Sequence, residues 1–466
     1  MRKTLLRGLI CSLVMFITVL ISAVSVDAAA KAFDVTSVSS DSVKLSWTVM
    51  ENANGYRIER YHNGKWKCVD EIKDEKLNSY VVGGLKSGTI YYFRLKYYII
   101  KDRNKQYYYL GGILRCTTAL SRVTGFSAAS GTDSVELMWN ALRDCDGYEL
   151  QRLSGTKWTA LGKLSGSEKN SITVSNLKKG REYDFRINAY KNCSSGIIYS
   201  NYSYLTFTAT DKQSIKLFGP NMVYVGESFD YTYCIEGDKD GEIKWSVTGD
   251  CGRITDKGKF TAVKKGKATI KASDSSGNMY AVLEVHCVGS AKEVDFLPMV
   301  NGISVANKTY PVPKDYDPKG LTAETARAFE SMRRDALKDG IKLRSISGYR
   351  SYKTQASSYS FWKESYGEYA DSFSAKPGFS EHQLGLAIDV NDMWARFADT
   401  KEGRWLKKNC YKYGFILRYP SYASEISTGY EYEPWHIRYV GKKLAKKVHF
   451  SGSTLEEYLG IDSSYR

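Results

Sequence analysis

Two histidines and an aspartate in the last third of the sequence have the residue types of a metal site. His382 and Asp389 belong to the segment Ser380-Glu-His-Gln-Leu-Gly-Leu-Ala-Ile-Asp, and His436 ends the segment Glu433-Pro-Trp-His. Two imidazoles and one carboxylate can bind zinc and leave the fourth tetrahedral position open for water. The metal would make that water acidic, and Glu433 could take its proton. We therefore expect a metal-dependent hydrolase.

The residues around these side chains predict strands as the elements that position them. Pro434 forces extended backbone just before His436, which excludes a zinc-binding helix of the His-Glu-x-x-His kind. Ile388 and Val390 flank Asp389. Because side chains alternate across a strand, we expect these two apolar residues in the core and the carboxylate on the opposite face, toward the metal.

Helices and further strands are expected around this segment. Thr322 is a candidate N-cap and Gly340 follows the last apolar position, which predicts a helix between them. Residues 400–413 predict another helix, and residues 343–347 a short strand. These elements indicate a domain that contains both helices and strands.

Arg350 would lie in the turn after that short strand. A guanidinium there can stabilise the oxyanion that forms when hydroxide adds to a peptide carbonyl, or it can hold a terminal carboxylate through paired hydrogen bonds. Two acids, Glu431 and Glu433, lie close to His436 in the sequence and compete for the role of base.

Three motif blocks resemble those of VanY-type D-alanyl-D-alanine carboxypeptidases. They are Ser347-Gly-Tyr-Arg-Ser-Tyr-Lys-Thr-Gln355, Ser380 through Asp389, and Glu433-Pro-Trp-His436, and the resemblance covers roughly residues 295–460. It implies a zinc (Zn2+) carboxypeptidase that acts on peptidoglycan stem peptides. The resemblance also implies a role for each site residue: His382, Asp389 and His436 as zinc ligands, Glu433 rather than Glu431 as the base, Arg350 at the oxyanion, and Gln355 and Ser380 in contact with substrate.

Two other functions remain open at this point. Related enzymes of this fold include L,D-carboxypeptidases and peptidoglycan endopeptidases, which pocket shape rather than metal ligands would separate. The third hypothesis is a non-catalytic surface adhesion protein that keeps zinc for stability. Glu433 and Arg350 argue against it, because a structural zinc site usually has a fourth protein ligand.

The front half contains an internal repeat of 92 residues. Ser42-Val-Lys-Leu-Ser-Trp47 returns as Ser134-Val-Glu-Leu-Met-Trp139, with apolar residues alternating as in strands that bury one face. The repeats, 31–120 and 121–210, resemble fibronectin type III domains, with a core tryptophan and a tyrosine corner in each, at Tyr91 and Tyr183. Exposed tyrosines of the first repeat could instead stack on sugar rings; the candidates are Tyr97, Tyr98, Tyr107, Tyr108 and Tyr109.

Residues 211–290 predict a third β-sandwich, and short motifs such as Trp245-Ser-Val resemble bacterial immunoglobulin-like group 2 domains. The expected fold class is therefore multidomain: three all-β sandwiches followed by an α+β zinc peptidase domain over 291–466. The three β modules contain no nucleophile paired with a base. We expect them to act as spacers or adhesive arms.

The first residues predict export. Basic residues, an apolar run from Leu9 to Val24 and the small residues at 28–30 are typical of a signal peptide over 1–30, so we expect a secreted or cell-wall-associated protein with no other membrane segment. The formal net charge of +16 predicts attraction to a polyanion. Anionic cell-wall polymers, or polysaccharide bound by the β modules, fit better than nucleic acid, for which no binding motif is present.

The cysteines permit disulfides in an exported chain. Nine are present, and removal of a leader containing Cys11 leaves an even number. None forms a Cys-x-x-Cys pair, which excludes zinc ribbons. Connectivity stays open, with Cys234 and Cys287 as the first pair to test.

Overall fold

The computed structural model describes residues 32–62, 64–130, 133–193, 196–210, 213–236, 242–421 and 425–466. The expected signal peptide lies outside these residues. Among the described helices, none is long and apolar enough to cross a membrane. Two compact units form: one contains residues 46–79 and 92–114, and the other contains residues 35–45, 80–91 and 115–466.

The first unit contains most of an antiparallel sheet of order β4-β3-β6-β7. Its strands are β3 (Gly55–His62), β4 (Lys65–Ile72), β6 (Ile90–Lys101) and β7 (Asn104–Thr117). Of the tyrosines considered for sugar stacking, Tyr98 is buried at 2% exposure, whereas Tyr109 is 62% exposed. Arg94 and Lys96 lie over the Tyr109 ring.

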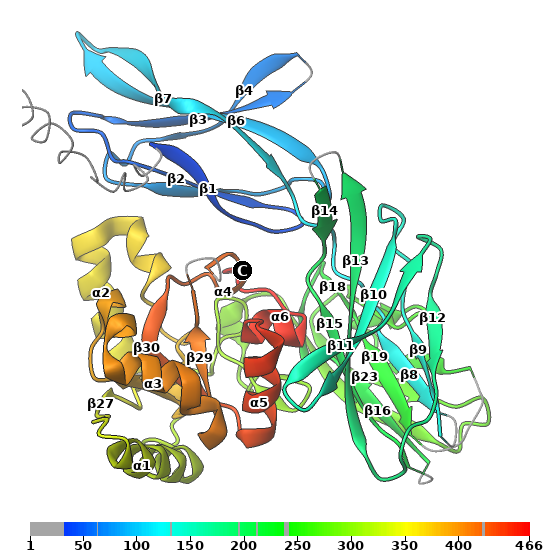
Figure 1. Cartoon of the computed structure of the whole chain (residues 1–466). Coiled ribbons are helices and arrows are strands. Elements are labelled where there is room, and N and C mark those ends of the chain that lie inside the picture. The colour runs from blue at the N-terminus through cyan, green and yellow to red at the C-terminus, as the bar shows by residue number, and fades with distance from the viewer. Residues whose placement is uncertain are drawn as a thin grey trace, which may run out of the picture. The chain divides into compact units, whose positions relative to one another are not determined.

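Most of a sheet of order β1-β2-β5 lies in the second unit; its strands are β1 (Phe33–Val38), β2 (Val43–Trp47) and β5 (Ser79–Val82). The second repeat follows with two sheets (Figure 1). Its strands are β8 (Ser127–Ser130), β9 (Val135–Met138), β10 (Gly147–Ser154), β11 (Lys157–Ser165), β12 (Ser171–Val174), β13 (Glu182–Cys193), β14 (Gly196–Tyr199) and β15 (Ser203–Thr208).

The tyrosine corners predicted from the sequence are confirmed. The hydroxyl of Tyr91 accepts a hydrogen bond from the backbone N–H of Lys86 at 2.7 Å, and Tyr183 accepts one from Lys178 at 2.7 Å. Trp139, the predicted core tryptophan of the second repeat, is 4% exposed. These aromatic residues therefore stabilise the sandwiches.

A third β region follows, with strands in sheets of order β17-β24-β23-β20 and β18-β22-β21, while β19 and β16 extend a sheet of the second repeat. The strands are β16 (Ser214–Phe218), β17 (Met222–Tyr224), β18 (Ser228–Asp230), β19 (Thr232–Glu236), β20 (Lys244–Thr248), β21 (Gly252–Ile254), β22 (Lys259–Ala262), β23 (Gly266–Ser273) and β24 (Tyr280–Val288). The immunoglobulin-like group 2 assignment stays a prediction.

The cysteine pair favoured by the sequence is not brought together. Cys234 packs into the core of the second repeat, whereas Cys287 lies in the core of the third β region beside Cys251. The thiols of Cys251 and Cys287 are hydrogen-bonded to each other, and burial raises the pKa of Cys287. All the described cysteines are free thiols.

The C-terminal part is α+β, as predicted. Its central antiparallel sheet has the order β27-β28-β30-β29, and helices α1, α2, α3 and α5 lie around it in Figure 1. The strands are β27 (Ser345–Ser347), β28 (Ala387–Val390), β29 (Phe415–Tyr419) and β30 (Glu433–Tyr439), preceded by the small hairpin of β25 (Met299–Val300) and β26 (Ile303–Ser304). The helices are α1 (Ala323–Lys338), α2 (Tyr352–Tyr366), α3 (Lys401–Asn409), α4 (Glu425–Thr428), α5 (Lys442–Ser451) and α6 (Leu455–Leu459).

Local sequence explains why these helices begin where they do. The side chain of Thr322 accepts a hydrogen bond from the N–H of Thr325 and caps α1, and Thr400 caps α3 in the same way. One face of the sheet then packs on both helices, because Ile388 and Ile437 share a core cluster with Phe329 of α1 and with Leu406 of α3. The opposite face of β28 and β30 remains for polar side chains.

Candidate metal centre

Strand alternation puts two of the expected metal ligands on one face of the sheet. Asp389 of β28 and His436 of β30 are direct partners in the antiparallel register. Their chain neighbours Ile388 and Ile437 are also partners and point into the hydrophobic core. Because facing residues of adjacent strands lie close together, the carboxylate and the imidazole meet on the polar face.

His382 reaches the same place from a short 3₁₀ helix, η3 (Glu381–Leu384), rather than from a strand. The Oγ of Ser380 accepts a hydrogen bond from the backbone N–H of His382 at 3.3 Å and caps this turn. The turn ends at Gly385 with φ +68, where a Cβ would lie 2.4 Å from the carbonyl oxygen of Gly320. Glycine is therefore required at the point where the chain enters β28.

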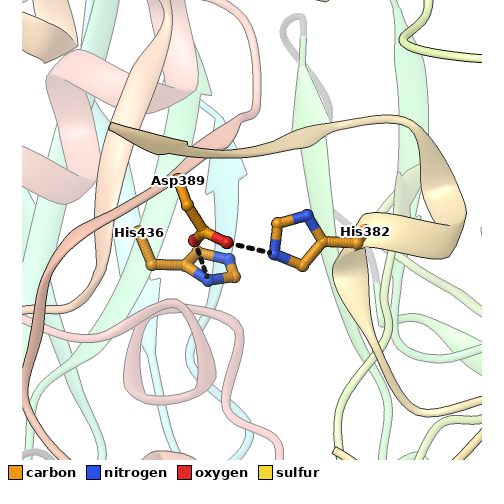
Figure 2. Close-up of side chains that lie close together, drawn as sticks. All are labelled: His382, Asp389 and His436. Carbon is orange, nitrogen blue, oxygen red and sulfur yellow. Dashed lines mark ion pairs between the residues drawn. The ribbon is translucent and has the colours of Figure 1, made fainter. Parts of the chain in front are cut away.

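The three side chains form a compact group. The Nε2 of His382 lies 3.2 Å from Oδ2 of Asp389, and the Nδ1 of His436 lies 3.4 Å from Oδ1 of the same carboxylate. Figure 2 shows the two oxygens of Asp389, one joined to each ring by an ion pair. One candidate ligand atom from each residue lies within 4.8 Å of the others, and all three residues are buried.

This donor set fits a divalent cation. The Nδ1 of His382 lies 2.6 Å from the carbonyl oxygen of Gly348, which can only accept, so Nδ1 carries the proton and the neutral ring has its lone pair on Nε2. That lone pair faces the carboxylate of Asp389, whose Oδ1 has no hydrogen-bond partner among the described residues. Converging lone pairs repel each other unless a positive charge lies between them, and two imidazoles with one carboxylate are ligands that zinc prefers.

The surroundings shift the pKa values of Asp389, His382 and His436 in different directions. Burial alone would raise the pKa of Asp389, but attraction to His382 and His436 in their protonated forms and to Arg350 more than offsets this and holds it well below its ordinary value. Burial lowers the pKa of His382. For His436, burial is outweighed by the attraction of the protonated ring to the carboxylates of Glu381 and Glu433, and the pKa rises to about 9.

Of the two acids that compete for the role of base, Glu433 lies at the centre. Its Oε2 lies 3.3 Å from the Nδ1 of His436, and burial raises the pKa of its carboxyl group. Glu431 is held elsewhere: it accepts hydrogen bonds from the hydroxyls of Tyr369 at 2.5 Å and Ser372 at 2.9 Å. A carboxylate with a raised pKa beside the ligand group is suited to accept and return a proton.

Arg350 reaches the centre from the turn before α2. Its Nη2 lies 3.8 Å from Oδ2 of Asp389, while its Nη1 donates to the Oε1 of Gln355 at 2.8 Å and its Nη2 to the Oγ of Ser347 at 3.1 Å. Gln355 is 1% exposed and donates through Nε2 to the carbonyl of Ala375 at 2.6 Å. Both ends of this amide are therefore engaged within the protein, and it holds the guanidinium in place.

The two residues expected to contact substrate are both buried. Gln355 lies under Arg350, and Ser380 is 5% exposed with its hydroxyl on the backbone of His382. Each thus has a structural contact, and the substrate contact stays a prediction.

A set of charged residues behind His436 was missed by sequence reasoning. Its members are buried at 2% exposure or less: Glu381, Arg418, Arg438 and Glu456. The available signal was the presence of Arg418 and Arg438 within apolar strand segments. A charged residue in such a segment is usually an edge or surface position, so the sequence alone gave no reason to place it in the core.

Comparison with protein families supports two kinds of domain. The model of the D-alanyl-D-alanine carboxypeptidase family VanY matches residues 318–442, which include all the candidate site residues. The model of the fibronectin type III domain matches residues 28–106 and 121–206. The matches cover most of the second repeat and, in the α+β part, the elements from α1 through β30; the hairpin of β25 and β26, most of α5 and all of α6 lie outside them.

Individual relatives resemble the C-terminal part. The YodJ protein of Bacillus subtilis strain 168 is 36% identical over 239 residues, 45% of this chain and 87% of that protein. The bifunctional D-Ala-D-Ala dipeptidase and D-Ala-D-Ala carboxypeptidase VanXYC of Enterococcus gallinarum is 36% identical over 34% of this chain and 94% of its own length. A D-alanyl-D-alanine carboxypeptidase of Enterococcus faecium is 41% identical over 30% of this chain, which spans 44% of that relative.

Proposed function

This chain belongs to the VanY family of D-alanyl-D-alanine carboxypeptidases, and we propose that it is a zinc-dependent carboxypeptidase that removes the terminal D-alanine of peptidoglycan stem peptides. The observation that carries this proposal is the convergence of His382, Asp389 and His436, with the carboxylate of Glu433 3.3 Å from the Nδ1 of His436. Three ligands and a free acid are the groups that metal-assisted peptide hydrolysis requires.

His382 through Nε2, Asp389 through its carboxylate and His436 through Nδ1 would hold the ion. A zinc ion held there supplies Lewis acidity, which polarises a peptide carbonyl and makes water a stronger acid. Glu433 accepts the proton of the attacking water on its carboxylate and returns it to the nitrogen of the leaving D-alanine. The raised pKa of Glu433 supports this role, because a base accepts and returns a proton most readily when its pKa is close to the working pH.

Arg350 stabilises negative charge on the carbonyl oxygen of the bond that is cut. Its guanidinium is fixed by Gln355 and Ser347, so its N–H groups are oriented before substrate arrives. Preorganised donors cost little reorganisation energy during the reaction, which favours the transition state over the bound peptide.

The protein acts outside the cell, secreted or associated with the wall. The basic and apolar leader of the sequence supports export, and the net charge of +16 supports attraction to anionic wall polymers. The β modules hold the peptidase near its polymeric substrate, through polysaccharide or through these polymers. Binding of the full chain to purified wall sacculi, with and without teichoic acid, tests this part.

The peptide specificity is tested with three substrates of different length. Purified protein reconstituted with zinc is incubated with a stem pentapeptide ending in D-Ala-D-Ala, with the tetrapeptide and with free D-Ala-D-Ala, and the products are weighed by mass spectrometry. We expect one D-alanine from the pentapeptide and an intact tetrapeptide. Shortening of the tetrapeptide alone would indicate an L,D-carboxypeptidase, and no cleavage by a zinc-loaded protein would favour a non-catalytic adhesion protein.

A further inference from the structure

Glu381 and His436 face each other with two buried atoms that lack hydrogen bonds. The Oε2 of Glu381 lies 3.7 Å from the Nε2 of His436. Neither atom has a hydrogen-bond partner among the described residues. Buried polar atoms without partners are rare and costly, so two that face each other across 3.7 Å point to a hydrogen bond that forms in another state of the site.

The carboxylate of Glu381 is fixed by its other oxygen. Its Oε1 accepts from the Nε of Arg418 at 2.7 Å and from the Nη1 of Arg438 at 2.8 Å. Arg438 is anchored in turn by the carbonyl oxygen of Ser304 at 2.7 Å. With two guanidinium groups on Oε1, the group cannot rotate freely, and Oε2 stays aimed at His436.

The negative charges of Glu381 and Glu456 are balanced by the positive charges of Arg418 and Arg438. Arg418 also donates to both carboxylate oxygens of Glu456, at 2.8 Å from Nη1 and 2.5 Å from Nη2. Glu456 accepts a further hydrogen bond from the amide of Asn307 at 3.0 Å. Two acids and two guanidiniums are thus buried together. Glu381 can therefore stay ionised and accept a hydrogen bond, because its charge is compensated.

We infer that Glu381 is a positioning residue for His436. When the Nε2–H of His436 donates to Oε2 of Glu381, the neutral ring keeps its lone pair on Nδ1, the nitrogen that faces Asp389 and Glu433. The hydrogen bond requires the two atoms to approach by less than about 1 Å. This inference rests on the proposed role of His436 as a metal ligand.

A purely structural role for Glu381 makes a different prediction. If the carboxylate only compensates Arg418 and Arg438, any loss of one negative charge from the cluster should have the same effect. Glu456→Gln is the matched control, because it removes one charge from the same cluster without contacting His436. Glu381→Asp keeps the charge but shortens the side chain, which withdraws the oxygen from the Nε2 of His436.

The experiment measures zinc affinity of the full chain by competition with a chromophoric chelator, together with the absorption spectrum of the cobalt(II)-substituted protein. Glu381→Gln and Glu381→Asp should weaken zinc binding by about 10- to 100-fold and shift the cobalt bands. Glu456→Gln should lower the urea midpoint yet leave the zinc affinity and the cobalt spectrum close to those of the wild type. Folding of each variant is checked by circular dichroism, and Glu381→Asp retains the charge balance if Glu381→Gln does not fold.

Two results would overturn the inference: unchanged zinc affinity in the folded Glu381 variants, or an equal loss of affinity in Glu456→Gln. His436→Ala separates these failures from a failure of the proposed function. If His436→Ala also binds zinc as tightly as the wild type, the proposed metal site is wrong. If only His436→Ala loses zinc, the metal site stands and Glu381 does not position its ligand.

Discussion

The carboxylate of Glu433 lies 3.3 Å from the Nδ1 of His436, on the side of the ring that also faces Asp389. Pro434 lies between the two residues in the sequence and keeps β30 extended. The proposed base and the proposed ligand are therefore carried by one strand. Their separation does not depend on a loop closing over the substrate.

Removal of either neighbouring ligand should abolish tight zinc binding. His382→Ala and Asp389→Ala each leave two ligands, so we expect less than about 0.1 zinc per chain after dialysis, against about one for the wild type. Metal content is measured by atomic absorption. His62→Ala, an exposed histidine in the first repeat, is the control and should keep the full zinc content. Full zinc content in the His382 and Asp389 variants would contradict the site.

Substitution of Arg350 or Gln355 should lower the same kinetic constant, kcat, by different amounts. Arg350→Ala removes the proposed donor to the carbonyl oxygen, and we expect kcat to fall by about 10²- to 10³-fold. Gln355→Ala removes a hydrogen bond to Arg350 at 2.8 Å, and a loss in kcat of roughly ten-fold with little change in KM is expected. A change confined to KM in Gln355→Ala would instead indicate that this amide contacts the substrate.

The free energy of unfolding should fall when the buried charged cluster loses one of its members. Glu456→Ala leaves the guanidinium of Arg418 buried at 0% exposure without this partner, which should cost about 3–5 kcal/mol in the free energy of unfolding. Urea unfolding monitored by tryptophan fluorescence measures this. The exposed pair of Glu330 and Arg333 provides the comparison, since Glu330→Ala should cost less than about 1 kcal/mol. Equal costs would show that the cluster does not contribute as a buried unit.

The stability of the protein should depend on Lys308 in alkaline solution. Burial lowers the pKa of Lys308 from 10.5 to about 8. Below pH 8 the ammonium is charged in both folded and unfolded chains, so the penalty of burying it is complete. Between pH 8 and 10.5 the folded chain releases the proton first and the unfolded chain binds more protons, so this contribution to stability rises with pH, by at most about 1.4 kcal/mol per pH unit.

Lys308→Met isolates this effect from all other titrating groups. The free energy of unfolding of the wild type relative to the variant should increase between pH 7.5 and pH 9.5, because only the wild type loses the penalty. Chemical denaturation at several pH values within this range measures the difference. Parallel curves for the two proteins would contradict a lowered pKa at Lys308.

Local sequence signals predicted the elements that depend on near neighbours. The N-cap at Thr322 gave the start of α1, and the alternation of Ile388, Asp389 and Val390 gave the orientation of β28. The tyrosine corners at Tyr91 and Tyr183 each depend on a hydrogen bond to a backbone N–H only a few residues earlier in the sequence. In each case the partners lie within a few residues, so the pattern contains the information.

Features that depend on distant partners were not predictable in the same way. His382 lies on a 3₁₀ turn, although a strand was expected, because a short turn capped by Ser380 leaves no periodic pattern. The pairing of Glu381 with Arg418 joins residues from different elements, and a single sequence does not show which charges are buried together. The proximity of Cys287 to Cys251 rather than to Cys234 has the same origin.

We propose that the group formed by His382, Asp389 and His436 serves hydrolysis with Glu433 as its base. D-alanine release from the stem pentapeptide is compared between the wild type and Glu433→Gln, after both have been shown to contain the same amount of zinc. We predict that the variant keeps its zinc and loses activity by about 10²- to 10⁴-fold, because the amide has the shape of the acid but cannot accept the proton. Equal D-alanine release by the two zinc-loaded proteins would contradict the claim.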